Sequence, residues 1–413
     1  MKKSTSNNIQ KKKLVFIHSY FYPDNSAGSQ MLSDLSFSLS SNAFNVSIIA
    51  SRKLRYDNAN KLLKKEEING THVYRVWSSN LGRNSYISRA IDYITLEISL
   101  LIKTFSTVQR GDIVILMTEP PMFNVLAYPI VRFKKGVIVN WVFDLFPEVA
   151  VSAGLFSKKS LINKFFQKLR DYAFIRANQN IVIGSKMFDY LKNLGVSENK
   201  VTLIHNWSDG KAIQPISSIN NPLCKEWNLT GKFVVGYSGN LGLAHDISTI
   251  LTVIWKLRLN LNIVFLFIGS GAGLYKIKKY VEDQNLKNVI FKPFQDSESL
   301  SLSLSVADIH WVTLNPKMEG YIMPSKFYGI LAAGRPVIFI GDIEGEIARE
   351  IDKIGCGCSL EIGESKKLED IIIQYADNPE FASKVGNKGR QKFLELYDFP
   401  VASMKFLNLF NEL

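Results

Sequence analysis

Short apolar runs alternate with helix-length segments along the first half of the chain. The runs are KLVFIHSY, FNVSIIAS, THVYRVW, DIVILMT, GVIVNWVFD, QNIVIG and KVTLIHN. They are almost continuously apolar, and stretches with a helical pattern, such as QMLSDLSFSLSSN, lie between them. Strands of this kind are buried on both faces, so the pattern predicts a parallel sheet covered by helices on each side.

The alternation stops in the middle of the chain and then restarts. Residues 207–230 are polar and turn-rich, with two prolines, as is typical of a linker. The strands expected beyond them are KFVVGYSG, NIVFLFIG, NVIFKPF, ADIHWVTL and RPVIFIG, and helices are expected at 246–259, 272–285, 297–306 and 325–333. Two further helices are expected to close the chain after Leu368.

The sequence therefore predicts an α/β fold with two doubly wound domains that face each other across a cleft. The chain of 413 residues is long enough for two domains of about 200 residues each. In open α/β sheets, ligands bind beyond the carboxyl ends of the strands, so we expect the site in the loops that follow KLVFIHSY, VVGYSG, FLFIGSG and WVTL. We expect a basic tail at 1–13, an N-terminal domain at 14–206, a linker at 207–230, a C-terminal domain at 231–396, and a helix at 397–413 that packs back on the N-terminal domain.

Composition indicates a cytoplasmic protein. Three cysteines cannot form a disulfide framework, and Cys356 and Cys358 have no second ligand pair nearby for a metal site. The N-terminus, MKKSTSNNIQKKK, has no apolar core after its lysines, so we interpret it as a basic tail and not a signal peptide. No stretch reaches about 18 uninterrupted apolar residues, so no bilayer-spanning segment is expected.

Two glycine-rich turns follow strands of the second half. GYSGNLGLAHD contains Gly239, Asn240 and Gly242, with His245 at the expected helix start, and FIGSGAG contains Gly269. Glycines let backbone amides approach a phosphate closely, and a helix start adds a partial positive charge. Ordinary tight turns are the alternative interpretation, but the recurrence after consecutive strands favours a nucleotide site.

A sharper signal lies in GYIMPSKFYGILAAGRPVIFIG. Pro324 suits the first turn of a helix, Ser325 can satisfy free amides there, and Lys326 places a cation at the same end. Such a helix start can hold a diphosphate. A capped helix with a solvated lysine is the alternative.

These segments resemble bacterial family 4 glycosyltransferases, particularly capsule and O-antigen enzymes with a Pro-Ser-Lys variant of the donor-binding segment. PSKFYGILAAGRPVI resembles that segment, YFYPDNSAGSQMLSDLSFSL their first glycine loop and helix, and VVGYSGNLG the opening of their nucleotide domain. DLFPEVAVSAGLF resembles an Asp-aromatic-Pro-Glu stretch of amino-sugar transferases, and HNWSD the interdomain junction. The likeness runs, with gaps, over most of residues 14–400, and its motifs stand in the expected order.

The resemblance implies a GT-B fold of two Rossmann-like domains. It also implies a retaining transferase that uses a nucleotide-diphosphate sugar, with a UDP-sugar as the first candidate. No metal and no cofactor are expected. Fixed amides and Lys326 would stabilise the departing diphosphate, and the acceptor hydroxyl would pass its proton to the leaving phosphate. The residues expected to bind the donor and its phosphates are Gly28, Gly239, Asn240, Gly242, His245, Gly269, Ser325, Lys326 and Gly329.

Two acids stand in the stretch that we place on the acceptor side of the cleft. Asp144 ends an otherwise apolar strand, which favours a functional position over a solvated turn. We expect Asp144 to orient the acceptor or a sugar hydroxyl during catalysis. Glu148 is expected on the acceptor side as well.

The chain departs from the family pattern at two places. Many members carry two glutamates spaced by seven residues, the second of which binds the nucleotide ribose; Tyr321 and Gly329 stand at these positions, and Glu319 is close but out of register. Phe143 stands where many relatives have a histidine that faces the donor sugar. Either this subgroup holds the ribose by other means or the transferase is weakened. We favour the first interpretation because the Pro-Ser-Lys helix start and the glycine turns are kept.

The net positive charge of the chain comes entirely from its first half. Residues 1–206 hold 28 Lys and Arg against 14 Asp and Glu, whereas the remainder holds 22 against 23. PPMFNVLAYPIVRFKKG and SRAIDYITLEISLLIKTF combine apolar and polar faces and suit an anionic membrane surface, with core helices as the alternative. We therefore expect peripheral association with the inner face of the cytoplasmic membrane and a polyprenyl-diphosphate-linked or oligosaccharide acceptor, in capsule or O-antigen polysaccharide synthesis.

Two other functions remain as alternatives, and a third is disfavoured. A UDP-sugar 2-epimerase shares this architecture but needs acid and base residues on both sides of the sugar. A non-catalytic sugar-binding or scaffold protein would explain the missing glutamates. A nucleic-acid partner is not expected, because the basic residues are scattered and no nucleic-acid-binding motif is present.

Overall fold

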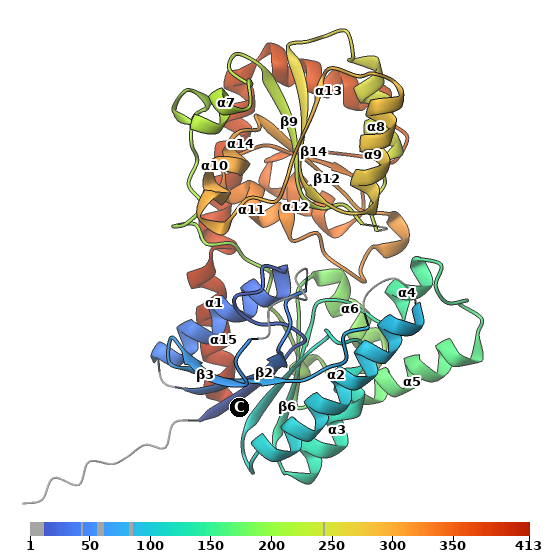
Figure 1. The fold of residues 1–413 in the computed structure, drawn as a ribbon, viewed down its shortest axis with the longest axis vertical. Coiled ribbons are helices and arrows are strands. Elements are labelled where there is room, and N and C mark those ends of the chain that lie inside the picture. The colour runs from blue at the N-terminus through green and yellow to red at the C-terminus, as the bar shows by residue number, and fades with distance from the viewer. Residues whose placement is uncertain (1–11, 43, 56–61, 82–85, 243) are drawn as a thin grey trace, which may run out of the picture.

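The computed structural model describes residues 12–42, 44–55, 62–81, 86–242 and 244–413. The described residues form two α/β domains, one above the other in Figure 1, each built around its own sheet. Helices cover both faces of each sheet, so the predicted fold class of two doubly wound domains is confirmed.

The N-terminal domain, the lower one in Figure 1, contains an eight-stranded sheet in the order β3-β4-β2-β1-β5-β6-β7-β8. All neighbours run parallel except the edge pair β3 and β4. The strands are β1 (Lys13–Ile17), β2 (Asn45–Ser51), β3 (Lys65–Ile68), β4 (Thr71–Val76), β5 (Ile113–Met117), β6 (Val137–Val142), β7 (Gln179–Val182) and β8 (Val201–Leu203). The helices are α1 (Ala27–Asn42), α2 (Tyr86–Thr107), α3 (Phe123–Phe133), α4 (Glu148–Ser152), α5 (Leu161–Arg176) and α6 (Ser185–Asn193).

The C-terminal domain contains a six-stranded parallel sheet in the order β11-β10-β9-β12-β13-β14. Its strands are β9 (Phe233–Asn240), β10 (Ile263–Ser270), β11 (Val289–Lys292), β12 (Ile309–Thr313), β13 (Val337–Ile340) and β14 (Gly357–Leu360). The helices are α7 (Pro222–Glu226), α8 (Ser248–Lys256), α9 (Ala272–Asp283), α10 (Leu300–Ser305), α11 (Lys326–Ala332), α12 (Glu346–Ile354), α13 (Ser365–Asp377), α14 (Pro379–Leu396) and α15 (Phe399–Glu412).

Burial on both faces explains why the strands are continuous apolar runs. In β1, Leu14 and Phe16 point into one hydrophobic cluster, with α1 and α15, while Val15 and Ile17 point into another, with α2 and α3. Successive side chains of a strand alternate between the faces, so every position of such a strand must be apolar.

Helix α15 crosses back to the N-terminal domain and packs beside α1. Phe406 and Phe410 are fully buried there, and the ring of Phe406 lies 4.9 Å from that of Trp141 on β6. The chain thus passes between the domains twice. Asp398 joins the two crossings, because its carboxylate accepts a hydrogen bond from the N–H of Gly210 at 2.8 Å.

Some elements differ from the sequence prediction. The edge strand β14 was not expected, and three helices, not two, follow it. The short strand β14 has one buried position and is otherwise half-buried, so it lacks the apolar signature of the inner strands. Among the described residues, no helix is both long enough and apolar enough to cross a bilayer.

Candidate active site between the two domains

A cavity of about 210 Å³ lies where the carboxyl ends of the two sheets face each other. Both domains contribute to it: Gly28 and Asp144 come from the N-terminal domain and Ser325 from the C-terminal domain. These three sequence-predicted residues, far apart in the chain, therefore line one site. The cavity is lined by His18, Ala27, Gly28, Met31, Arg55, Thr118, Glu119, Phe143, Asp144, Ile183, Asn206, Met323 and Ser325.

Asp144 lies just beyond the end of β6, and its carboxyl group opens into the cavity. The N–H groups of Phe143 and Asp144 both donate to the hydroxyl of Thr118, at 3.1 and 3.3 Å, which fixes the turn. Asp144 is exposed by its surface area, but desolvation by the surrounding protein raises its pKa to about 6. The negative charge of Glu119 adds to this shift, and Arg55 opposes it. A carboxyl group with such a pKa can hold or release a proton near neutral pH.

A charged cluster that the sequence analysis missed stands next to Asp144. Arg55 binds both carboxylate oxygens of Glu119, at 3.0 and 2.9 Å, and the Nε2 atom of His18 lies 3.7 Å from Glu119. Burial lowers the pKa of His18, so the ring is neutral near pH 7. Glu119 could have been found, because it directly follows the apolar run DIVILMT, at the carboxyl end of β5.

Gly28 lets the start of α1 approach His18. A Cβ atom at position 28 would lie 3.1 Å from the Nε2 atom of His18, a contact that is too tight to form without movement. The absence of a side chain at position 28 therefore allows the start of α1 to lie this close to His18, at the edge of the cavity.

Lys326 begins α11 and extends its side chain over Gly239, at the end of β9. A Cβ atom at position 239 would lie 2.5 Å from Cε of Lys326, and Gly239 has a φ of +130°, which disfavours other residues. The Nζ atom lies 5.3 Å from the ring centre of Tyr237. Among the described residues, no carboxylate pairs with Lys326, and burial lowers its pKa to about 8. A half-buried cation without a carboxylate partner is stabilised by a bound anion.

The predicted glycine turns lie next to each other around this lysine. Gly269 pairs in register with Gly239 on the neighbouring strand, and a Cβ atom at position 269 would lie 2.3 Å from the carbonyl oxygen of Gly239. Asn240 ends β9 with an exposed side chain, and Gly242 follows two residues further on. The two strand ends thus offer the close backbone approach that a diphosphate needs.

His245 also lies near Lys326. Its Nδ1 atom is 2.6 Å from the carbonyl oxygen of Thr313, and a carbonyl can only accept, so the Nδ1–H donates and Nε2 is left as an acceptor. Burial, together with the charge of Lys326, lowers the pKa of His245 to about 4. The ring is therefore neutral near pH 7 and adds no positive charge beside Lys326.

Ser325 and Glu148 have surroundings that the sequence did not predict. The Ser325 hydroxyl does not cap the amides of α11 and lines the cavity instead. Glu148 is buried away from the cavity and is bound by Arg170, by Gln167 at 2.9 Å and by Tyr190 at 2.7 Å. Burial alone would raise the pKa of Glu148, but the hydrogen bond and charge of Arg170 outweigh this effect and lower it. Glu148 is thus part of a structural ion pair and does not line the cavity, and its role on the acceptor side stays a prediction.

The positions of the missing glutamates have other surroundings. Gly329 lies inside α11, where an added Cβ atom would make ordinary van der Waals contacts with Leu304 at 3.5 Å and Ser208 at 3.8 Å, so a methyl group fits there. The carbonyl of Tyr321 accepts a hydrogen bond from the N–H of Leu145, 2.9 Å away in the other domain. Glu319 accepts from the N–H of Glu346 at 2.8 Å, so it is held beside α12.

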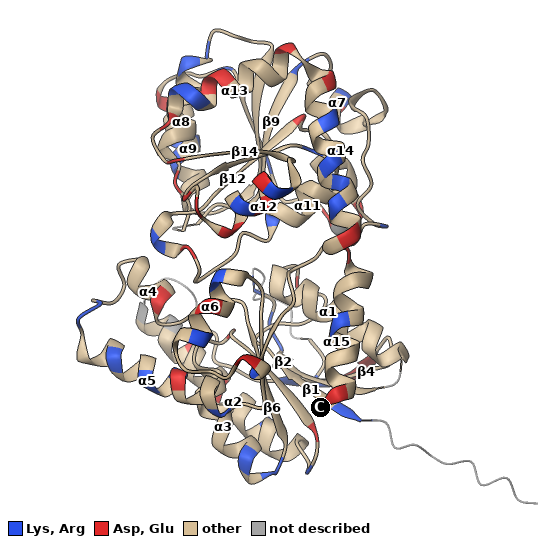
Figure 2. Cartoon of the chain, turned by 180° about the vertical axis from the view of Figure 1, so that it is seen from behind, with Lys and Arg blue, Asp and Glu red and all other residues tan. Residues whose placement is uncertain are grey.

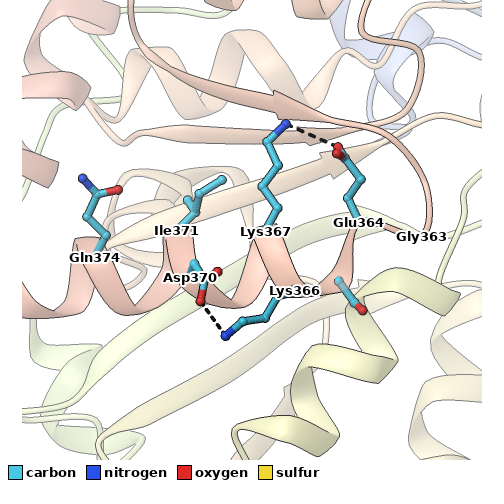
Figure 3. Close-up of a pocket in the computed structure, with 8 residues that line it drawn as sticks. Gly363, Glu364, Lys366, Lys367, Asp370, Ile371 and Gln374 are labelled. Atoms are coloured by element: carbon cyan, nitrogen blue, oxygen red, sulfur yellow. Dashed lines mark hydrogen bonds and ion pairs between the residues drawn. The ribbon is translucent and has the colours of Figure 1, made fainter.

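A second hollow lies on the first turns of α13, at the end of the C-terminal domain opposite the cleft (Figures 1 and 3). Its charged side chains are paired with one another, Lys367 with Glu364 at 3.4 Å and Lys366 with Asp370 at 2.8 Å. Both lysines of this hollow are therefore neutralised by neighbouring carboxylates.

Comparison with known proteins identifies the class. The model of a family described as "Glycosyl transferases group 1" matches residues 224–392. A probable glycosyltransferase of Pseudomonas aeruginosa, WbjE, is 31% identical over 331 residues, which are 79% of this chain and 80% of that protein. A putative colanic acid biosynthesis glycosyl transferase of Escherichia coli (strain K12), WcaI, is 25% identical over 169 residues, 40% of this chain and 41% of the relative.

Solved structures show the same fold. The sucrose-phosphate synthase of Thermosynechococcus elongatus superposes with a TM-score of 0.77 at 16% identity, covering 97% of this chain and 99% of that one. The Anabaena protein HepE, in complex with UDP and glucose, superposes with a TM-score of 0.71 at 14% identity, covering 97% and 100%. The architecture is that of the GT-B glycosyltransferases. The chain belongs to the group 1 glycosyl transferases, with relatives in polysaccharide biosynthesis.

Proposed function

We propose that this glycosyltransferase is a retaining, metal-independent enzyme that uses a UDP-sugar. The observation that carries the proposal is Lys326, a half-buried cation without a carboxylate partner among the described residues, directly over Gly239. A diphosphate is the anion that fits two glycine turns and a helix start. We choose UDP as the nucleotide because HepE, which shares the fold of this chain, is in complex with UDP and glucose.

The proposed reaction follows from the positions of these groups. The diphosphate binds at Lys326 and the turns of Gly239 and Gly269, and the sugar extends into the cavity towards Asp144. The bond between the anomeric carbon and the phosphate oxygen breaks, and Lys326 and fixed amides stabilise the charge that develops on that oxygen. The acceptor hydroxyl attacks from the same face and passes its proton to the leaving phosphate. Asp144 orients a hydroxyl group of the acceptor or of the sugar.

The acceptor in this proposal is a lipid-linked or surface glycan, such as a polyprenyl-diphosphate-linked saccharide, in the synthesis of capsule, O-antigen or exopolysaccharide. The relatives support this direction, since one is named for colanic acid biosynthesis and another, from Staphylococcus aureus (strain COL), is named a poly(ribitol-phosphate) α-N-acetylglucosaminyltransferase. The enzyme would work at the inner face of the cytoplasmic membrane.

A transfer assay tests the proposal. The protein would be incubated with a panel of UDP-sugars and a polyprenyl-diphosphate saccharide, with and without EDTA, and the product examined by NMR. A product with the anomeric configuration of the donor, formed equally with EDTA, is expected. An inverted product would contradict retention, and loss of activity with EDTA would contradict metal independence. A change in the donor sugar without acceptor would instead indicate the UDP-sugar 2-epimerase.

A further inference from the structure

Three helices of the N-terminal domain lie next to one another and carry an unusual outer surface. Helix α3 contacts α2 on one side and α5 on the other, and the layer covers the sheet face opposite α1 and α15 (Figure 1). Large apolar side chains are exposed along this layer, although the helices bury their other faces in the core. Monomeric proteins seldom expose contiguous apolar surface of this kind unless it binds something.

On α2 the exposed residues form a continuous stripe. Its members recur every three or four positions, so they share one side of the helix, and Ile87 is 74% exposed. The stripe continues onto α3, where the ring of Phe133 stacks on Phe105 at 6.2 Å. The stripe consists of Ile87, Ile91, Ile94, Ile98, Ile102 and Phe105.

On α5 apolar and basic side chains are exposed together. Leu161 is 81% exposed, and Ile162 and Phe165 lie beside it in the first turns of the helix. Four lysines at positions 158, 159, 164 and 168 are exposed on the same helix and the turn before it. Figure 2 shows these basic residues as blue segments along α5. An apolar tip surrounded by lysines is the pattern of helices that enter the headgroup region of a membrane.

The layer has no opposing exposed negative charge. Among the described side chains of α2, α3 and α5, every acid is at least half-buried, and Asp171 is paired with Arg170 at 2.7 Å. Burial raises the pKa of Glu97 on α2 to about 7, which reduces its charge near neutral pH. The surface is therefore apolar and positive, so its complement is apolar and negative.

We propose that the outer face of α2, α3 and α5 docks on an anionic lipid bilayer, with Leu161, Ile162 and Phe165 in the interface and the lysines on the headgroups. A second copy of the chain fits this face less well, because a two-fold contact would bring the same lysines of both copies together. The buried pair of Arg170 and Glu148 holds α5 to the domain and so gives this face a fixed shape.

Vesicle sedimentation of the full chain tests this surface. The wild type is expected to pellet with phosphatidylglycerol-containing vesicles, and not with phosphatidylcholine alone, in about 0.15 M NaCl. A triple variant, Lys158→Glu, Lys159→Glu and Lys164→Glu, should bind about tenfold or more weakly, since each basic residue near an anionic surface contributes to attraction. Equal binding of wild type and variant, or equal binding to both vesicle types, would overturn the proposal.

The chain offers a matched control in the other domain. Lys276, Lys278 and Lys279 are exposed on α9, and their reversal to Glu changes the net charge by the same amount. This control should bind vesicles more strongly than the α5 triple variant. Comparable losses of vesicle binding in the α5 and α9 triple variants would overturn the docking surface. A dimer of the wild type that the α5 variant dissociates would also overturn it, in favour of a second copy. UDP binding, measured in parallel, is expected to be unchanged in both triples, so failure of the membrane surface and failure of the transferase proposal are distinguishable.

A second variant set removes apolar contact without changing charge. Leu161→Ser, Ile162→Ser and Phe165→Ser should weaken vesicle binding, while Leu259→Ser and Leu261→Ser, both exposed in the C-terminal domain, should leave it unchanged. The opposite order would contradict insertion of α5. All five side chains are exposed, so the free energy of unfolding should change little in either set.

Discussion

The carboxylate of Glu346, in the C-terminal domain, binds the first turn of α6 in the N-terminal domain through Ser185. It accepts hydrogen bonds from the N–H and from the hydroxyl of Ser185, each at 2.8 Å, and from the N–H of Lys186 at 2.9 Å. A carboxylate at a helix N-terminus is stabilised by these free amides and by the helix dipole. The contact therefore helps to set how far apart the two halves of the active site lie.

Replacement of Glu346 by alanine should loosen the contact between the domains. The variant removes the charged acceptor of three hydrogen bonds at the partly exposed start of α6. Because hydrogen bonds to a charged group are stronger than neutral ones, the free energy of unfolding should fall by about 1–3 kcal/mol. Small-angle X-ray scattering should show a larger radius of gyration than the wild type. Glu344→Ala is the matched control, because Glu344 is exposed and two residues away. Equal scattering curves for Glu346→Ala and Glu344→Ala would contradict a role in domain spacing.

The Arg170–Glu148 pair predicts a stability effect, not an effect on acceptor binding. Glu148→Ala removes the buried partner of Arg170 and leaves only the partly exposed Asp171 beside it, which should lower the free energy of unfolding by about 3 kcal/mol in urea denaturation. The double variant Glu148→Leu with Arg170→Met should recover much of that loss, because no buried charge remains. A stable Glu148→Ala protein with a raised KM for acceptor would support the acceptor-side hypothesis.

Asp144 should impose a pH dependence on transfer. Its pKa of about 6 is above the ordinary aspartate value of 3.8, so the carboxylate needed for orientation is lost as the pH falls through about 6. The free energy of unfolding should change in the opposite direction to the activity. Between pH 3.8 and about 6 the folded state binds more protons than the unfolded state, so the free energy of unfolding falls as pH rises. We expect kcat/KM to decline below pH 6 in the wild type and to be low and flat in Asp144→Asn. An unchanged acid limb in Asp144→Asn would assign the titration to another group.

Gly239 should be as important for nucleotide binding as the lysine above it. An alanine there would place its Cβ atom 2.5 Å from Cε of Lys326 and would also strain the backbone at a φ of +130°. Gly231→Ala separates the two effects, since Gly231 has a positive φ of +74° but no atom within 4 Å of an added Cβ. Isothermal titration with UDP should show at least about tenfold weaker binding in Gly239→Ala only. Equal affinities in the two variants would place the diphosphate elsewhere.

The sequence predicted those features that depend on residues close together in the chain. Apolar runs and strand-end residues placed Asp144, Gly28 and Ser325 at the edges of the sheets that meet at the cavity, because strand order brings carboxyl ends together. The edge strands β3 and β14 were missed because they are short and only half-buried, so neither shows the apolar run of an inner strand.

Pairing between distant segments could not be predicted. The sequence predicted that Glu148 lies at the cleft, whereas in the structure it binds Arg170 on α5, twenty-two positions away. Arg55 meets Glu119 across 64 positions, and Glu346 meets Ser185 across 161. Such partners depend on how loops and domains pack, and no spacing in a single sequence encodes them.

The most direct test of the account is the thermal stability of the purified protein with UDP, in the wild type, in Lys326→Ala and in Lys276→Ala. Lys276 is an exposed lysine of the same domain and serves as the control. A ligand that binds the folded state raises the melting temperature by mass action. A UDP concentration of about 100 times Kd should raise it by about 3 °C. We predict this rise in the wild type and in Lys276→Ala, and its loss in Lys326→Ala. No rise in the wild type with UDP, or an equal rise in Lys326→Ala, would contradict a donor diphosphate held at Lys326.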